Sequence, residues 1–346
     1  MVRFQPRSLR RPVVGAPMAG GPSTPELAAA VSNAGGLGCL AAGYRTPELL
    51  RQEIRRTRAL TSAAFGVNLF VPRHANTVSS GTPGDLLENA LAFRDRLVRD
   101  TGLELPLPDP LDDDGWAAKL EIVAAERVPV VSLTFGLPAP SVISTLVDAG
   151  SLVAVTVTGP AEARAAADAG AGMLCVQGPE AGGHRGTWDS TAPPPGAGLP
   201  DLLRQVRTVC PELFLVAAGG IASQSDAAGL RRAGADAVQV GTLLLLSPEA
   251  GTGAVHRAAL TDEGFPGTSL TRAFSGRWAR GLTNAFMRDY ADAPAAYPYT
   301  HQVTAPLRAA ARDAGDPQRA SLWAGTGFRA ARPRPAADTV RWLAGG

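Results

Sequence analysis

Eight short apolar runs, separated by segments with helical patterns, constrain the fold of this chain more than any other feature. We expect strands at residues 13–17, 37–41, 65–70, 130–134, 152–157, 173–177, 214–218 and 237–241. Runs that are apolar throughout are typical of parallel strands buried on both faces. Eight strands alternating with helices match a closed (β/α)8 TIM barrel of the α/β class. A doubly wound open sheet gives similar local patterns, and we favour the barrel over it.

Several segments exceed what eight βα units need. One insertion runs from residue 72 to about 127, and a second follows Gln177. Loops of such length beside strand ends are usually lids or surface excursions. After the eighth strand, helical patterns continue at residues 254–261, 282–290 and 304–314. We therefore predict a barrel of residues 1–246 and 317–346, with residues 247–316 as a smaller, mainly helical cap domain.

The charge distribution favours a small-molecule partner. The formal net charge is +2, and the arginines are scattered rather than gathered in a stripe, so we expect neither nucleic acid nor an anionic membrane surface as a partner. No segment approaches the roughly 20 apolar residues of a membrane span. Arg10 and Arg11 are not followed by the apolar region of a signal peptide. We expect a soluble, cytoplasmic protein.

Two rare residue types exclude other chemistries. Lys119 is the only lysine, so a Schiff-base mechanism would have to use it. It falls in a polar helical pattern over residues 114–126, and we expect its side chain on a solvated face. Cys39, Cys175 and Cys210 are widely spaced in apolar runs, without a CxxC pair or zinc-ligand spacing. They predict reduced core thiols and no metal site.

A glycine-rich loop at residues 177–186 (QGPEAGGHRG) places His184 directly after the sixth strand. Barrel enzymes keep their chemistry at the carboxyl ends of the strands. Glycine lets the backbone reach unusual conformations and lets a ligand approach the main chain closely. The loop predicts a cofactor site, and a flexible loop with a chance histidine is the alternative.

Glycines also follow the seventh and eighth strands. Residues 218–221 (AGGI) precede a helix start at residues 223–226, and residues 239–242 (QVGT) end the eighth strand. Bare amides near a helix N-terminus bind phosphate, and barrels often bind phosphate after these two strands. The alternative is a purely structural origin for each turn.

Two further strand ends meet the same rim. The first strand ends in residues 16–20 (APMAG), and the third contains residues 66–68 (GVN). The backbone near Met18 can line a flat ring, and Asn68 can hold a phosphate or a ring edge. An Asn in an apolar strand is costly to bury unless it is paired.

Together these five motifs resemble the FMN-dependent nitronate monooxygenases, formerly called 2-nitropropane dioxygenases, over essentially the whole chain. The resemblance implies a barrel with a helical substrate domain that oxidises alkyl nitronates with dioxygen to carbonyl compounds and nitrite. The FMN contacts that it implies are Met18, Asn68, Gln177, Gly182, Gly219, Gly220, Gln239, Gly241 and Thr242. The phosphate would lie on the last five.

His184 matches the active-site histidine of that family. The resemblance implies that it hydrogen-bonds the nitro or nitronate group and removes the proton next to the nitro group of a neutral nitroalkane. Imidazole suits this task because its pKa lies near working pH. The alternative is a structural histidine that bonds the loop backbone.

Residues 297–301 (YPYTH), 306–308 (PLR) and 322–325 (LWAG) resemble terminal motifs of the larger class of bacterial nitronate monooxygenases. Tyr297, Tyr299 and His301 would line the substrate entrance, and packing of the cap is an equal alternative. The sequence has Thr326 where the family pattern has Gln, and it lacks lysines that help to bind an anionic substrate. A carboxylated nitronate would therefore need arginine or tyrosine hydroxyls.

We expect a cytoplasmic FMN enzyme that oxidises nitronates such as propionate 3-nitronate and so detoxifies nitro compounds. The nearest alternative is an FMN-dependent NAD(P)H reductase of the same superfamily, either an enoyl-ACP reductase or an NADH:quinone reductase. Fold alone does not separate them. A flavin-free sugar-phosphate isomerase or lyase leaves Met18 and Asn68 unexplained, and a barrel that serves only as a binding or scaffold module is a third alternative.

Overall fold

Each of the eight apolar runs forms a strand, with bounds within two residues of the expected ones. A computed structural model describes residues 4–77, 83–194 and 196–345, and the other positions, part of the 72–127 insertion among them, lie outside the described residues. The strands are β1 (Val13–Gly15), β2 (Gly38–Ala41), β3 (Phe65–Phe70), β4 (Val130–Thr134), β5 (Leu152–Val157), β6 (Met173–Gln177), β8 (Phe214–Ala218) and β9 (Ala237–Val240).

These strands form a parallel barrel. Their order is β1-β9-β8-β6-β5-β4-β3-β2, and a parallel bridge between Val14 and Leu37 brings the two ends of the sheet together. There the Gly15 amide donates to the Leu37 carbonyl at 2.9 Å, and the Leu37 amide donates to the Val13 carbonyl at 3.0 Å. The barrel prediction is confirmed, and an open sheet is excluded.

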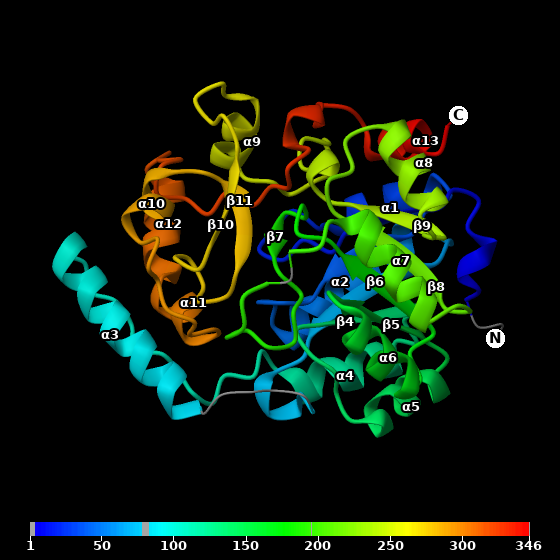
Figure 1. Ribbon diagram of the computed structural model, residues 1–346, viewed down its shortest axis with the longest axis horizontal. Coiled ribbons are helices and arrows are strands. Elements are labelled where there is room, and N and C mark those ends of the chain that lie inside the picture. The colour runs from blue at the N-terminus through cyan, green and yellow to red at the C-terminus, as the bar shows by residue number, and fades with distance from the viewer. Residues whose placement is uncertain (1–3, 78–82, 195, 346) are drawn as a thin grey trace.

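Eight helices surround the barrel (Figure 1). They are α1 (Pro25–Asn33), α2 (Pro47–Leu60), α4 (Trp116–Ala125), α5 (Pro140–Asp148), α6 (Pro160–Asp168), α7 (Leu199–Val209), α8 (Gln224–Arg232) and α13 (Ala336–Leu343). The helix α13 packs against both α8 and α1, which closes the outer ring. The C-terminal helix therefore lies against the helices that surround the barrel. Within the described part of the chain, no helix combines the length and apolarity needed to cross a membrane.

Local signals start several of these helices at the rim formed by the carboxyl ends of the strands. The hydroxyls of Thr24, Thr46 and Ser223 accept hydrogen bonds from the backbone amides of the first turns of α1, α2 and α8. Such caps satisfy amides that have no partner within the helix. The helix N-termini thus lie at the same edge of the barrel as the motif residues.

The core has two layers. The larger layer consists of apolar side chains between the strands and the helices. The smaller layer is a separate cluster that includes Val14, Val130 and Val216. Cys39 and Cys175 are buried in the barrel, and burial raises the pKa of each thiol to about 12. All three cysteines are unpaired and buried. The prediction of reduced core thiols is confirmed.

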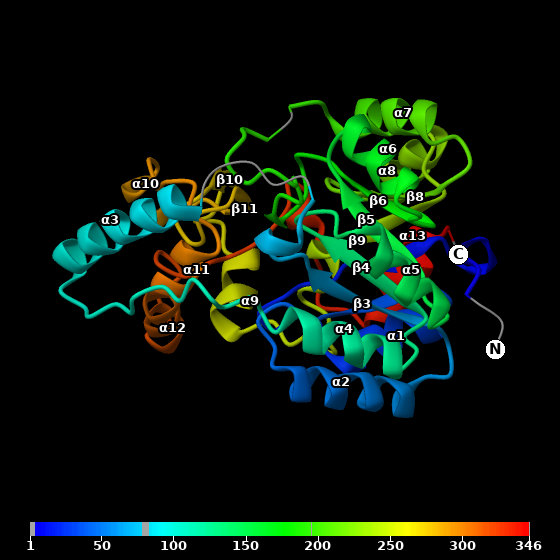
Figure 2. The ribbon, with the colours of Figure 1, turned by 90° about the horizontal axis from the view of Figure 1, so that it is seen from below.

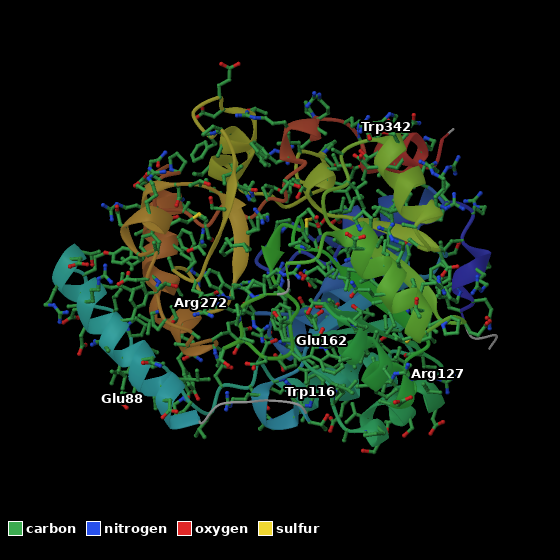
Figure 3. All side chains as sticks on the ribbon, viewed as in Figure 1. Glu88, Trp116, Arg127, Glu162, Arg272 and Trp342 are labelled. Carbon is green, nitrogen blue, oxygen red and sulfur yellow. The ribbon has the colours of Figure 1, made fainter. Side chains whose placement is uncertain are left out.

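Lys119 does not lie on a solvated face, and that prediction was wrong. Its side chain is 2% exposed. The ammonium lies 2.8 Å from an Asp114 carboxylate oxygen and donates to the Ala42 carbonyl at 2.9 Å. Burial of a charge is tolerated where such partners replace water. Trp116, labelled in Figure 3, marks the start of α4, where the insertion rejoins the barrel.

The segment after β9 is less helical than the sequence suggested. It contains α9 (Ala254–Thr261), α10 (Ala285–Asp289), α11 (Tyr299–Val303) and α12 (Ala305–Asp313). However, it also contains β10 (Thr268–Thr271) and β11 (Ala279–Leu282), and β11 pairs with both β10 and β7 (Gly183–His184) in an antiparallel sheet. The pattern expected to be one helix over 282–290 is divided between β11 and α10. The domain boundaries at residues 247 and 316 stay a prediction.

The 72–127 insertion joins the cap. Its helix α3 (Pro83–Thr101) lies beside the cap elements and away from the barrel in both views (Figures 1 and 2). Phe93 and Leu97 pack in one cluster with Phe274 and Phe286. Tyr290 belongs to the same cluster, and its hydroxyl donates to Asp100 at 3.2 Å. The helix α3 therefore packs against the cap, and the chain rejoins the barrel at α4.

Candidate active site

A cavity of about 620 Å³ lies at the carboxyl ends of the barrel strands, beneath the cap. This volume is typical of small-molecule and cofactor sites. All nine residues suggested as FMN contacts line it, together with His184 and His301. The nine are Met18, Asn68, Gln177, Gly182, Gly219, Gly220, Gln239, Gly241 and Thr242. Motifs spread over more than 200 residues of sequence thus meet in one place.

Backbone without side chains forms one wall of this cavity. Gly219 and Gly220 have φ of +127° and +70°, values that other residues rarely adopt. A Cβ at Gly219 would lie 2.9 Å from the Ala181 amide nitrogen, and a Cβ at Gly182 would lie 2.5 Å from the Gly325 nitrogen. Glycine is therefore required here for space as well as for conformation. The exposed amides beside the N-terminus of α8 suit a phosphate.

Two polar strand residues in the cavity wall are held by their neighbours. The Asn68 side-chain nitrogen donates to the hydroxyls of Ser132 at 2.8 Å and Thr134 at 2.9 Å. The Gln177 amide donates to the His184 carbonyl at 3.0 Å and accepts from the Gly186 amide at 2.8 Å. Gln177 therefore fixes the backbone of the loop that carries His184.

His184 faces the cavity and bonds a side chain of the cap. It lies in β7, opposite Ala279 of β11. Its Nε2 is 2.9 Å from the Ser275 hydroxyl oxygen. The Ser275 hydroxyl also donates to the Arg277 carbonyl at 3.2 Å. Because the Ser275 hydroxyl hydrogen goes to the Arg277 carbonyl, the Ser275 oxygen accepts the hydrogen on Nε2 of His184. The other ring nitrogen of His184, Nδ1, is then the hydrogen-bond acceptor.

The electrostatic surroundings keep His184 neutral. Burial lowers its pKa to about 3, and the positive charges of Arg277 and Arg308 act in the same direction. A neutral imidazole offers one donor and one acceptor. A negative ligand beside it would stabilise its protonated form and raise this pKa. The histidine is thus a hydrogen-bonding group in the free protein.

The cap side of the cavity is positively charged. Arg308 and Arg312 line it, and among the described residues no aspartate or glutamate does. Arg308 donates to the His301 carbonyl at 2.7 Å. Burial lowers the pKa of Arg308 to about 10, which leaves the guanidinium charged at neutral pH. This wall favours an anion over a neutral or cationic ligand.

Of the three cap residues suggested at the substrate entrance, only His301 lines the cavity. Tyr299 is 7% exposed and packs with Leu86 and Ala90 of α3. The helix α11 turns this side chain toward the insertion, where it packs. Tyr297 lies just behind the wall, with its hydroxyl oxygen 3.4 Å from that of Tyr44 and its ring 6.0 Å from the His184 ring.

Comparison with known proteins decides the family. The family profile described as nitronate monooxygenase matches residues 7–345. The chain belongs to the nitronate monooxygenase family. It is 35% identical over 338 residues to a probable nitronate monooxygenase of Staphylococcus aureus strain MSSA476, which covers 96% of this chain and 93% of the relative. Membership makes the protein an oxidoreductase and confirms the resemblance seen in the motifs.

Solved structures agree with this assignment. A nitroalkane oxidase from Streptomyces ansochromogenes superposes with a TM-score of 0.88 at 46% identity, over 98% of this chain and 96% of that one. FabK from Thermotoga maritima superposes with a TM-score of 0.73 at 27% identity, over 98% and 93% of the two chains. The match to the nitroalkane oxidase is the closer of these two.

This nitronate monooxygenase family member also has cavity residues that the sequence analysis missed. Tyr44 stacks on His301 with ring centroids 4.0 Å apart. His256 lines the cavity, and its Nε2 is buried without a hydrogen-bond partner among the described residues. Tyr44 lies three positions after the end of the second strand, and this position could have predicted that it reaches the cavity. No local pattern distinguishes His256 from the rest of its helix.

Proposed function

We propose that the protein binds FMN in the cavity and oxidises alkyl nitronates with dioxygen, giving carbonyl compounds and nitrite. The main support is the placement of His184 and Arg308 around one cavity that has a glycine wall and no acidic lining residue among those described. Family membership and the nitroalkane oxidase relative support the same class of substrate. Detoxification of nitro compounds is the physiological role that we propose.

The residues of the cavity fit FMN. Its phosphate would be held after β8 and β9 by Gly219, Gly220, Gln239, Gly241 and Thr242. Its ring would lie against the backbone near Met18 and contact Asn68, Gln177 and Gly182. The bare amides suit a phosphate, and the unpartnered His256 Nε2 provides a further polar contact for a bound group. Bound FMN would supply the electron acceptor and the reactivity toward dioxygen.

The charge of the site favours a nitronate over a neutral nitroalkane. A nitronate is already an anion, so it needs no base. His184, with a pKa of about 3, is a weak base in the free protein. It is well suited to hydrogen-bond a negative oxygen, and the guanidinium of Arg308 stabilises the same charge. Arg308 and Arg312 also provide the arginines that a carboxylated substrate such as propionate 3-nitronate requires.

The proposal is tested by product analysis with protein that has been loaded with FMN. Ethyl nitronate and air should give acetaldehyde and nitrite with matching oxygen consumption, and NADPH or NADH should give no comparable oxidation. Rapid oxidation of NAD(P)H with no nitrite from any nitronate would instead favour the FMN-dependent reductase. A protein that takes up no FMN would contradict the cofactor itself.

A further inference from the structure

We propose that Lys119 is a positioning residue which, through Asp114, fixes Tyr44 against His301 at the mouth of the cavity and so controls how nitronates enter. We call these four residues the latch. The consequence for nitronates rests on the proposed function, whereas the positioning of Tyr44 does not depend on it.

The first element of the latch is the buried ammonium of Lys119. The Lys119 side chain is 2% exposed. Among the described residues, its Nζ has two partners, the Ala42 carbonyl in the loop after β2 and the Asp114 carboxylate. A buried ion pair is rarely a net gain in stability, because desolvation of both charges offsets their attraction. A methionine of similar length could fill the same space without that cost. The charge therefore calls for a role other than packing.

The second element links this charge to the backbone of Tyr44. The same Asp114 oxygen that faces Lys119 accepts a hydrogen bond from the Tyr44 amide at 2.9 Å. Asp114 and Tyr44 have φ of +60° and +65°, in the left-handed region, which aspartate adopts more readily than most residues but which is unfavourable for tyrosine. Strained backbone of this kind persists where the surroundings hold it in place. One carboxylate oxygen thus connects α4 to a strained loop at the rim.

The third element is the ring of Tyr44, which connects the barrel to the cap. It stacks on His301 with centroids 4.0 Å apart and planes 9° from parallel. Both residues line the cavity, and Tyr44 is 37% exposed, so the stack lies where the cavity meets solvent. Arg308 donates to the His301 carbonyl. A shift of Tyr44 would therefore loosen the residue that holds the cavity arginine.

A second contact shows that the insertion itself forms this connection. The side chain of Gln302, next to His301, accepts from the Asp109 amide at 2.6 Å and donates to Asp112 at 3.2 Å. Residues 109–114 thus bond the cap through Gln302 and the barrel loop through Tyr44. Residues 109–114 act as a strap beside the cavity mouth, and Lys119 anchors the strap where the chain enters α4.

The positioning is tested by hydrogen exchange on the FMN-loaded protein. Lys119→Met should increase exchange in peptides covering residues 42–46 and 299–304 about tenfold, because loss of a charge-assisted hydrogen bond corresponds to about one order of magnitude. The matched control is Ser151→Ala, which removes a buried hydroxyl that donates to Val128 at 2.7 Å outside the latch. Unchanged exchange at both peptides in Lys119→Met would overturn the proposal.

Kinetics test whether Lys119 acts through Tyr44. Lys119→Met should raise KM for ethyl nitronate about tenfold, because a charge-assisted hydrogen bond is lost, and should change kcat by no more than about twofold. In a Tyr44→Ala background the lysine substitution should add little, since residues that act as one unit are not additive. Equal effects in both backgrounds would show that Lys119 acts elsewhere, and the proposal would be wrong.

The positioning of Tyr44 can be tested even if the proposed function fails or the Lys119 variant does not fold. If the wild-type protein oxidises no nitronate, the proposed function fails, while hydrogen exchange still decides the positioning. If Lys119→Met does not fold, Asp114→Asn replaces it, because the amide keeps an acceptor for the Tyr44 amide but loses the charge that faces Lys119. It should give increased exchange in the same two peptides, and unchanged exchange would again overturn the proposal.

Discussion

The Nε2 of His184 lies 2.9 Å from the Ser275 hydroxyl, so a residue of the cap, rather than a carboxylate, orients the histidine that faces the cavity. A carboxylate partner would stabilise the charged imidazolium and raise its pKa. A hydroxyl does not, and burial beside two arginines keeps the pKa near 3. The site therefore favours an anionic ligand, and His184 is a weak base in the free protein.

Replacement of His184 separates the two kinds of substrate. His184→Asn should reduce kcat/KM for neutral nitroethane by about 10²-fold or more, the usual size of general-base catalysis. For ethyl nitronate the loss should be about tenfold, because only a hydrogen bond is removed. Steady-state rates with both forms at one pH measure this. Equal losses for the two substrates would contradict the division of roles.

Replacement of Arg308 tests the charge of the cap wall. Arg308→Met should raise KM for ethyl nitronate by about 10- to 100-fold, since a charge-assisted hydrogen bond to a buried anion is lost. Arg308→Lys should recover part of the affinity, because it restores the charge without the planar guanidinium. An unchanged KM in Arg308→Met would show that the anion binds elsewhere.

The glycine wall can be tested without any turnover. A Cβ at Gly182 would lie 2.5 Å from the Gly325 nitrogen, whereas a Cβ at Gly159 would meet nothing within 4 Å. Gly182→Ala should therefore lose FMN affinity and about 1–3 kcal/mol of unfolding free energy through overpacking. Gly159→Ala should change neither. Titration with FMN and chemical denaturation make the comparison, and equal FMN affinities would argue against the proposed cofactor wall.

The pH dependence of stability should report His256. Burial lowers its pKa to about 4, against an ordinary value of 6.5. The folded state then binds fewer protons than the unfolded state between these values, so stability falls as pH falls from about 6.5 to about 4. Between pH 7 and pH 5 the wild type should lose up to about 2 kcal/mol more than His256→Gln. Chemical denaturation at the two pH values checks this, and identical losses would contradict it.

Much of the fold could be predicted because its signals are local. Strands such as β5 and β6 are continuous apolar runs, and parallel strands bring their carboxyl ends to one rim whatever lies between them. That rule alone places Asn68, Gln177 and Gly219 together. The small antiparallel sheet was missed, because β7 has two residues and β10 and β11 have four each, and Leu282 at the end of β11 begins a pattern that was expected to be helical.

The surroundings of several side chains depend on tertiary contacts. Lys119 occupies a polar helical pattern, and its burial becomes visible only when Asp114 and the loop at Ala42 are placed beside it. Tyr299 and His301 are two positions apart on α11, so their side chains point in different directions. Which of the two side chains faces the cavity depends on where α3 packs, and the hydrophobic periodicity of the sequence does not predict the position of α3.

Anaerobic mixing of the FMN-loaded protein with ethyl nitronate tests the central claim most directly. The flavin absorbance near about 450 nm should be lost with the nitronate and should persist with NADPH, because in the proposed function FMN would accept electrons from an anion bound beside His184 and Arg308. Persistence of that absorbance with the nitronate, together with rapid loss on addition of NADPH, would contradict the account.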